Sequence, residues 1–255
     1  MIQSLYTAAT GAKNQQLRID AIANNVANID TDGFKSSRVC FKDAVYQTMR
    51  SPLQPQDNTK NLELGHGVLV SDTTTDFSQG AIRATGESLD FALDGEGFFT
   101  VAGEGKETYY TRSGLFSISD EDDGTYLVTK QGNYVLDSQG ERIKLPSDIE
   151  GITCSETGVL ADASGKPFAT IGLASFKNPQ GLVKMGGGLY AATDASGPAG
   201  DAGDAKVIQR YAEGSNVDLV DEMAKLIRAQ RAYSLISRAI TTSDQMESTA
   251  NDLRR

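Results

Sequence analysis

The sequence predicts an α+β protein in which an N-terminal and a C-terminal helix pair, coiled-coil-like, beside a central antiparallel β-rich domain. Two observations point to the helices: apolar residues recur at steps of three and four at the start of the chain and again near its end. A third points to the sheet, because the segment between them alternates apolar with polar residues and is broken by frequent glycines.

The first helix is predicted from a heptad pattern that ends near Ile29, where Asp30-Thr31-Asp32-Gly33 supplies turn residues and a glycine stop. Most positions between the apolar ones are uncharged and polar, and the alanines permit close approach. We therefore expect this helix to touch neighbours on several sides. The heptad positions are Ile2, Leu5, Ala9, Ala12, Gln16, Ile19, Ala23 and Val26.

The last helix shows the same pattern, with Ile227 and Ile236 widening its apolar stripe. Ser215 to Asp218 has the spacing of a capping box, and acidic residues precede basic ones as the helix dipole prefers. Two amphipathic helices packed on the protein's own core would give similar patterns, but heptads at both ends favour a helix pair. The heptad positions here are Leu219, Met223, Leu226, Gln230, Tyr233, Ser237 and Ile240.

The middle of the chain reads as short strands joined by turns. Leu89, Phe91 and Leu93 alternate with polar residues, and Gly132-Asn133 between two apolar runs is a hairpin signal. We expect a sandwich or an open barrel, with Ser51 to Gly65 as an extended connector. The predicted domains are residues 1–45 together with 206–255 for helical assembly, 46–87 as connector, and 88–205 as the β domain.

The composition argues against two classes of function, nucleic-acid binding and membrane insertion. The formal net charge of −10 argues against nucleic-acid binding, which needs a basic face. No apolar run approaches the ~18 residues of a membrane span, so no membrane insertion is expected. The first residues do not form a cleavable secretory signal, so export would use another route.

Nothing in the sequence predicts an enzyme, a cofactor or a metal site. His66 is the only histidine and lies between two glycines, and no nucleophile elbow is present. Asp120 to Gly124 lacks the acidic spacing of a calcium loop, and Cys40 and Cys154 lack metal-ligand spacing. We expect no catalytic, cofactor-binding or metal residue.

One segment of the sequence says far more about the protein's relatives than the composition does. Ala23-Asn24-Asn25-Val26-Ala27-Asn28-Ile29-Asp30-Thr31-Asp32-Gly33-Phe34-Lys35 closely resembles the N-terminal signature of the flagellar rod and hook protein family. Tyr110 to Gly114 continues the resemblance, and Glu213 to Asp218 and Gln230 to Tyr233 look like the family's C-terminal signature. The signature residues are Asn24, Asn25, Asn28, Thr31, Gly33, Phe34, Asn216, Gln230 and Arg231.

The resemblance implies a structural role. Family members leave the cell unfolded through the flagellar export apparatus, with an uncleaved N-terminus, and pair their terminal helices into the inner tube of a helical polymer. The implied partners are further copies of this chain and other rod and hook subunits. The implied location is the basal body, outside the cytoplasmic membrane in the periplasm or cell wall, where the rod transmits torque from motor to hook.

Within the family, the overall length and Tyr46 to Arg50 look most like the distal rod subunit, while a proximal-rod, rod-like or hook subunit stays open. A secreted β-rich binding module or a carboxylate enzyme would be rivals of another class. We expect the assembly seam to comprise Ile2, Leu5, Ala9, Ala12, Ile19, Val26, Leu219, Met223, Leu226, Tyr233 and Ile240.

Overall fold

The computed structural model describes residues 2–49, 62–103, 107–121, 123–146, 151–203 and 205–253, and it confirms the predicted α+β class. Side chains are described for these residues except 2–4, 47–49 and 62–64. The chain packs into two compact units. We call residues 1–27, 37–74 and 218–255 the helical unit, and residues 28–36 and 75–217 the β unit. These bounds differ from the predicted domain limits, because residues 28–36, 75–87 and 206–217 lie in the β unit and residues 46–74 lie in the helical unit.

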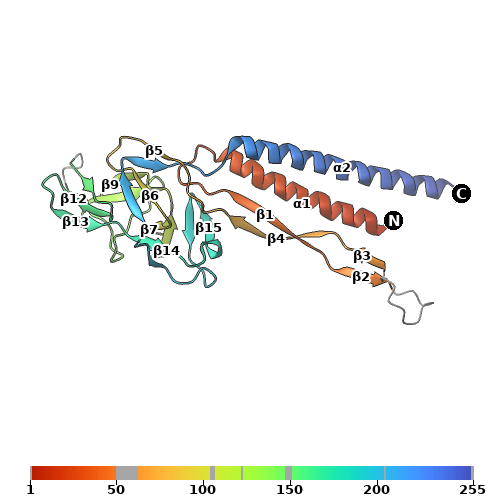
Figure 1. Cartoon of the computed structure of the whole chain (residues 1–255), viewed down its shortest axis with the longest axis horizontal. Coiled ribbons are helices and arrows are strands. Elements are labelled where there is room, and N and C mark those ends of the chain that lie inside the picture. Colours follow the sequence, from red (N-terminus) through yellow and green to blue (C-terminus); the bar gives the residue numbers. More distant parts are fainter. Residues whose placement is uncertain are drawn as a thin grey trace. The chain divides into compact units, whose positions relative to one another are not determined.

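Two antiparallel helices of unequal length dominate the helical unit, and they lie side by side (Figure 1). α2 starts with Asp218 as its N-cap, whose carboxylate accepts from the amides of Val220 and Asp221. The predicted cap at Ser215 is therefore wrong by three residues. The elements of this unit are α1 (Ile2–Ala27), β1 (Ser37–Asp43), β2 (Tyr46–Met49), β3 (Leu62–Gly65), β4 (Val68–Thr75) and α2 (Leu219–Asp252).

The strands of the helical unit pair as β1 with β4 and β2 with β3, and β1 packs on α1. In the antiparallel β2–β3 pair, Tyr46 lies opposite Gly65. On the α1 side, a side chain at Gly67 would meet Thr10 at 2.9 Å, so glycine allows the strands to approach the helix. Of the predicted connector Ser51 to Gly65, residues 51–61 lie outside the described part of the chain.

The β unit is built on a six-stranded sheet of order β15-β16-β8-β7-β14-β17, joined by smaller two- and three-stranded sheets. Its elements are β5 (Ile82–Ala84), β6 (Phe91–Asp94), β7 (Phe98–Ala102), β8 (Thr108–Thr111), β9 (Phe116–Glu121), β10 (Gly124–Thr129), β11 (Thr153–Cys154), β12 (Val159–Ala161), β13 (Pro167–Thr170), β14 (Leu173–Ser175), the 3₁₀ turn η2 (Pro179–Gly181), β15 (Val183–Gly186), β16 (Leu189–Ala191), β17 (Gly200–Asp201), β18 (Lys206–Gln209) and β19 (Tyr211–Glu213).

Both faces of the six-stranded sheet are covered by apolar side chains. Neighbouring residues of a strand point to opposite faces, so Phe98 and Phe99 of β7 enter two different clusters. Phe99 packs edge-to-face on Phe116, while Phe98 meets Tyr190. The predicted hairpin at Gly132 is also present, since the Thr129 amide donates to the Asn133 carbonyl and Gly132 has a φ of 87°. This unit therefore has a core of its own.

Candidate functional site

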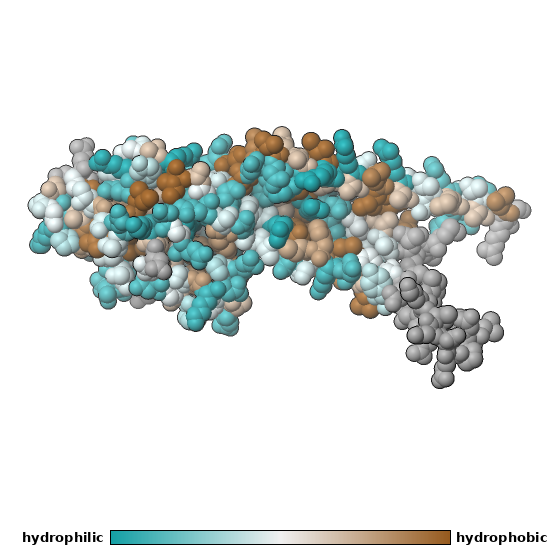
Figure 2. Space-filling model, in the orientation of Figure 1, coloured by the Kyte–Doolittle hydropathy of each residue, from teal (hydrophilic) through white to brown (hydrophobic). Residues whose placement is uncertain are grey.

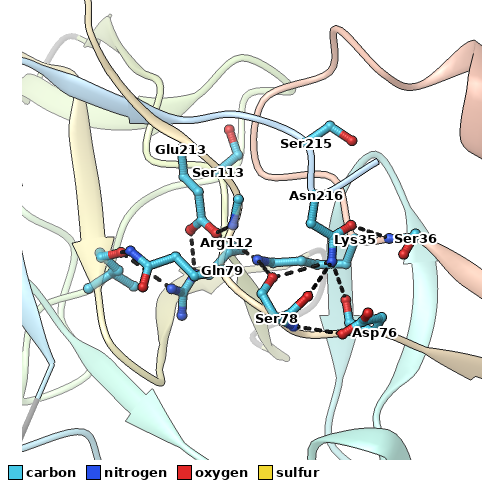
Figure 3. A network of polar contacts seen from close by, with 12 residues as sticks. Lys35, Ser36, Asp76, Ser78, Gln79, Arg112, Ser113, Glu213, Ser215 and Asn216 are labelled. Atoms are coloured by element: carbon cyan, nitrogen blue, oxygen red, sulfur yellow. Dashed lines mark hydrogen bonds and ion pairs between the residues drawn. The ribbon is translucent and has the colours of Figure 1, made fainter. Parts of the chain in front are cut away.

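Lys35, in the segment that follows α1, is completely buried in the β unit (Figure 3). Its Nζ donates to Glu213 Oε1 at 2.6 Å and to the Ser78 carbonyl at 2.7 Å. Burial lowers the pKa of Lys35, and the neighbouring Glu213 carboxylate opposes that shift. A lysine ammonium is retained in a protein interior only where such partners replace water.

Glu213 joins Lys35 to a second buried cation. Its Oε2 accepts from Arg112 Nε at 2.6 Å, and its Oε1 accepts from the Gly80 amide at 2.8 Å. The remaining Arg112 nitrogens donate to the carbonyls of Gly97, Gly95 and Leu93. One carboxylate thus serves two cations in a region closed to solvent. Removing it would leave two uncompensated charges, the costly way to break a buried ion pair.

Asn216 completes this group of residues (Figure 3). Its Oδ1 accepts from the Ser36 amide at 2.8 Å, and its Nδ2 donates to the Asp76 carbonyl at 2.8 Å. The segment after α1 and the segment before α2 therefore lie against each other and against residues 76–80. We call Lys35, Ser78, Arg112, Glu213 and Asn216 the anchor network.

Gly33 lies beside the anchor network in a backbone conformation that favours glycine. Its φ is 71°, and its amide donates to the Glu213 carbonyl at 2.7 Å. A Cβ at this position would stand 2.5 Å from the Ser113 amide nitrogen. The predicted role of Gly33, to turn the chain after the first helix, agrees with this geometry.

A second polar cluster lies within the helical unit. Asn25 of α1 is buried, and its side-chain amide both donates to the Ser37 carbonyl and accepts from the Ser37 amide, each at 2.9 Å. Asn25 Nδ2 also lies 3.2 Å from Glu222 Oε2 of α2, and Lys225 pairs with the other Glu222 oxygen at 2.7 Å. We call Asn25, Ser37, Glu222 and Lys225 the helix clamp, because it ties the end of α1 to β1 and to the start of α2.

The predicted seam residues divide by exposure in the single chain. Half-buried are Ala12, Ile19, Val26, Leu226 and Ile240. Exposed are Leu5, Ala9, Leu219, Met223 and Tyr233, and the Ile2 side chain lies outside the described ones. The buried contacts of the helix pair instead centre on Ile22 and Ala229, which the heptad assignment passed over. The exposed apolar positions are therefore available to other chains.

The predicted signature residues also divide. Asn25, Gly33 and Asn216 lie in or beside the two polar clusters. Thr31 donates to Asn28 Oδ1 at 3.2 Å, and the Phe34 ring lies 5.4 Å from the Lys184 ammonium. Asn24, Gln230 and Arg231 are exposed on their helices.

The sequence interpretation missed Lys35, Arg112, Glu213 and Glu222 as site residues. Lys35, Arg112 and Glu213 stand inside segments that match the family, and a charged residue in each of three such segments was the available signal.

The residues considered for chemistry do not come together. His66 Nδ1 lies 3.0 Å from the Val45 carbonyl, and burial raises the pKa of the Cys154 thiol to about 12. In the part of the chain that the structure describes, no group of three or more His, Cys, Asp or Glu residues is placed to hold a metal ion. None of the described helices is long and apolar enough to span a membrane.

Comparison with known proteins assigns the chain. Three family models match in order: "Flagella basal body rod protein" over residues 5–35, "Flagellar hook protein FlgE/F/G D1 domain" over 92–161, and "Flagellar basal body rod FlgEFG protein C-terminal" over 208–253. The chain is 39% identical to the flagellar basal-body rod protein FlgG of Bacillus subtilis over 269 residues, with both chains fully covered. It belongs to the flagellar basal-body rod protein family.

Other flagellar proteins are similar over the same length. FlgG of Borreliella burgdorferi is 37% identical, and the flagellar hook-basal body complex protein FlhP of Bacillus subtilis is 28% identical, each with full coverage of both chains. The predicted family is confirmed, and the higher identity to FlgG than to FlhP of the same organism agrees with the resemblance to the distal rod subunit. Three residues of the anchor network, Lys35, Arg112 and Glu213, lie one in each of the three matched regions.

Proposed function

We propose that this chain is a structural subunit of the flagellar basal-body rod, which polymerises into a helical tube and transmits torque from motor to hook. The observation that carries the proposal is full-length similarity to a rod protein, and a helix pair that buries few of its apolar residues agrees with it. A helix whose outward face carries apolar side chains requires partners. The role is mechanical and involves no reaction.

The helices provide the assembly surface in this proposal. On α2, Val220 is 78% exposed and Met223 and Ile227 are about half exposed, along one side of its first turns. Figure 2 shows such apolar residues at intervals along α2 on the face in view. The seam expected from the sequence, from Ile2 to Val26 and from Leu219 to Ile240, would then be filled by neighbouring copies and by other rod and hook subunits.

The test is Leu226→Asp, which puts a charge on the half-buried side of α2. We expect cells that depend on this chain for motility to lose swimming and to lack complete basal bodies in electron micrographs, while the β unit of the purified variant unfolds at its usual temperature. Burial of an unpaired carboxylate accounts for the loss. Ile118→Asp, an apolar-to-acid change at an exposed position of β9 in the β unit, is the control and should retain assembly.

Swimming cells with complete basal bodies in the Leu226→Asp strain would show that the seam is assigned to the wrong face. If the Ile118→Asp strain also failed to assemble, the β unit would be shown to make contacts that assembly requires.

Location and export form a second part of the proposal. We place the subunit outside the cytoplasmic membrane, in the periplasm or cell wall, after delivery by the flagellar export apparatus without removal of the first residues. The rod family and the heptads that begin at Ile2 support this. Mass spectrometry of the chain from isolated basal bodies should find its N-terminal peptide intact, and a processed N-terminus would contradict this route.

A further inference from the structure

A hollow in the surface of the β unit brings together side chains from β10, from the end of β7 and from the residues that follow the Gly132 hairpin. It holds about 960 Å³, which is in the range of sites that bind small molecules. A Cβ added at Gly132 or Gly140, both in the lining, would meet nothing within 4 Å. This side of the hollow is therefore open to solvent.

Alternation along extended segments determines which side chains line the hollow. Some residues of these segments are buried in the core of the β unit, so their neighbours in the chain point the other way. The buried residues are Leu127, Val135 and Ile143. The outward residues, all in the lining, are Tyr126, Tyr134, Arg142 and Lys144. The core thus presents two tyrosines and two cations on one surface.

The two tyrosines and Arg142 hold one another in place. The Tyr126 and Tyr134 rings meet edge to face with their centroids 5.9 Å apart, and the Arg142 guanidinium carbon lies 4.0 Å from the Tyr134 ring centroid. The Tyr134 hydroxyl donates to Glu121 Oε1, and this hydrogen bond raises the pKa of the hydroxyl. A guanidinium stacked on a ring keeps its N–H groups at its edge, where they can donate to a ligand.

The two cations have no carboxylate partner among the residues that the structure describes. Arg142 forms no hydrogen bond or ion pair with them, and Lys144 Nζ donates to a backbone carbonyl, that of Asp123. The β unit has 23 acidic residues against 12 basic ones, yet none of its described carboxylates pairs with these two. An anionic group of a ligand would supply the partner that both cations lack.

The other polar groups of the lining favour a ligand that also carries hydroxyls. Glu107 and Glu141 line the hollow and would repel a ligand with negative charge alone. Their carboxylates can accept from hydroxyl groups, and the Asn133 side-chain amide, which has no hydrogen bond within the described chain, can both donate and accept. The tyrosine rings offer apolar area. A carboxylated sugar combines all of these complementary groups.

We propose that this hollow binds an oligosaccharide whose sugar rings carry carboxylate groups. Arg142 and Lys144 bind a carboxylate, and Tyr126 packs on the apolar face of a ring. Glu141 and Asn133 bind hydroxyl groups. A polyacidic peptide fits less well, because it has no hydroxyls for the acidic residues of the lining. The whole site lies within the β unit, so it needs no second copy and goes beyond the proposed structural role.

Isothermal titration calorimetry of the purified full-length monomer tests the site, with tetragalacturonic acid as the probe. Its fully methyl-esterified form has the same rings without the negative charges. We expect the acid to bind at least tenfold more tightly than the ester. Arg142→Gln should weaken binding of the acid about ten- to a hundredfold, because a hydrogen-bonded charge pair is lost, and should have little effect on the ester.

Two further variants separate the ring contact from general charge. Tyr126→Ala should weaken binding of both the acid and the ester about three- to tenfold, because both probes lose the aromatic contact. Lys177→Gln is the control, since it removes one positive charge at an exposed position of the β unit outside the lining, and it should leave both affinities unchanged. Each variant should unfold at the wild-type temperature, because the altered side chains lie outside the core.

Several results would overturn the proposal. They are no binding of the acid at millimolar concentration, equal binding of acid and ester, and an Arg142→Gln variant that binds the acid as tightly as the wild type. Tetra-aspartate tests the peptide alternative. If it binds more tightly than tetragalacturonic acid and loses affinity in Arg142→Gln, the hollow recognises an acidic peptide and not a sugar.

Discussion

The β unit and the helical unit achieve stability by different means. The β unit buries a large set of aromatic and aliphatic side chains on both faces of its main sheet, including Phe91, Leu93 and Phe99. In the helical unit, the only fully buried side chains among those described are Ile22, Asn25, Glu222 and Ala229. A unit with so few buried apolar groups gains little from burial within one chain. Within one chain it therefore draws less stability from burial than the β unit does.

The two units also differ in net charge. The β unit carries 23 acidic against 12 basic residues, a formal charge of −11, whereas the helical unit has 11 against 12 and a charge of +1. Like charges repel, so a surface that must pack against copies of itself benefits from near neutrality, while a solvated one gains solubility from net charge. The acidity of the whole chain therefore belongs to the unit that does not supply the predicted seam.

The largest effect that would sharpen this comparison is expected from Glu213→Ala in the β unit. It leaves Lys35 and Arg112 as buried unpaired cations, which should cost about 3–5 kcal/mol of unfolding free energy. Chemical denaturation measures it. The control Glu156→Ala removes an exposed pair with Lys206 and should change stability by less than about 0.5 kcal/mol. Equal effects of the two variants would show that the anchor network adds nothing.

Gly33→Val should have the next largest effect, about 3 kcal/mol, from a left-handed conformation combined with a clash against the Ser113 backbone. Gly86→Ala is the control, since Gly86 has a φ of 84° and nothing within 4 Å of the added carbon. It should cost only the conformational part, about 1 kcal/mol, in the same denaturation experiment. A tolerated Gly33→Val would mean that the turn after α1 can rearrange.

Asp218→Ala tests the helical unit and should cost about 1 kcal/mol, because the first amides of α2 lose their cap. The stability of the helices in the monomer can be measured by following the helical circular dichroism signal during heating. Ser215→Ala, at the position where the sequence pattern put the cap, should have a smaller effect. If the β unit loses as much stability as the helices in Asp218→Ala, the two units unfold together and the comparison between them breaks down.

The smallest effect is expected at Arg210, between β18 and β19, where a substitution should raise the stability of the β unit. Arg210 has a φ of 67°, the only positive φ among described non-glycine residues. Arg210→Gly should relieve this conformation and raise the stability of the β unit by about 0.5–1 kcal/mol, partly offset by the greater freedom of glycine in the unfolded chain. Arg210→Lys keeps the strain and should leave denaturation unchanged. A destabilised Arg210→Gly would mean that the side chain matters more than the backbone.

Local patterns in the sequence were enough to predict the helices, the antiparallel class and the hairpin at Gly132, because spacing and turn residues act over a few positions. The buried face of the helix pair was harder to predict, since alanines and Gly11, where an added Cβ would stand 3.8 Å from Ile236, carry no strong apolar signal. The N-cap was predicted at Ser215 instead of Asp218 because both residue types suit the start of a helix.

The anchor network could not be predicted from local pattern. Lys35 and Glu213 are 178 residues apart, and Arg112 joins them from a third segment. Each looks like an ordinary surface charge in its own stretch of sequence. Only the folded chain shows that both cations pair with the one carboxylate away from water.

That separation has a consequence for the order in which the chain becomes competent. A polypeptide delivered from its first residue presents Lys35 early, but the carboxylate that allows this lysine to be buried arrives only when about five-sixths of the chain has passed. A fragment ending before Glu213 can neither close the anchor network nor supply α2. Every chain that ends before Glu213 therefore lacks the carboxylate that lets Lys35 be buried in the turn after α1.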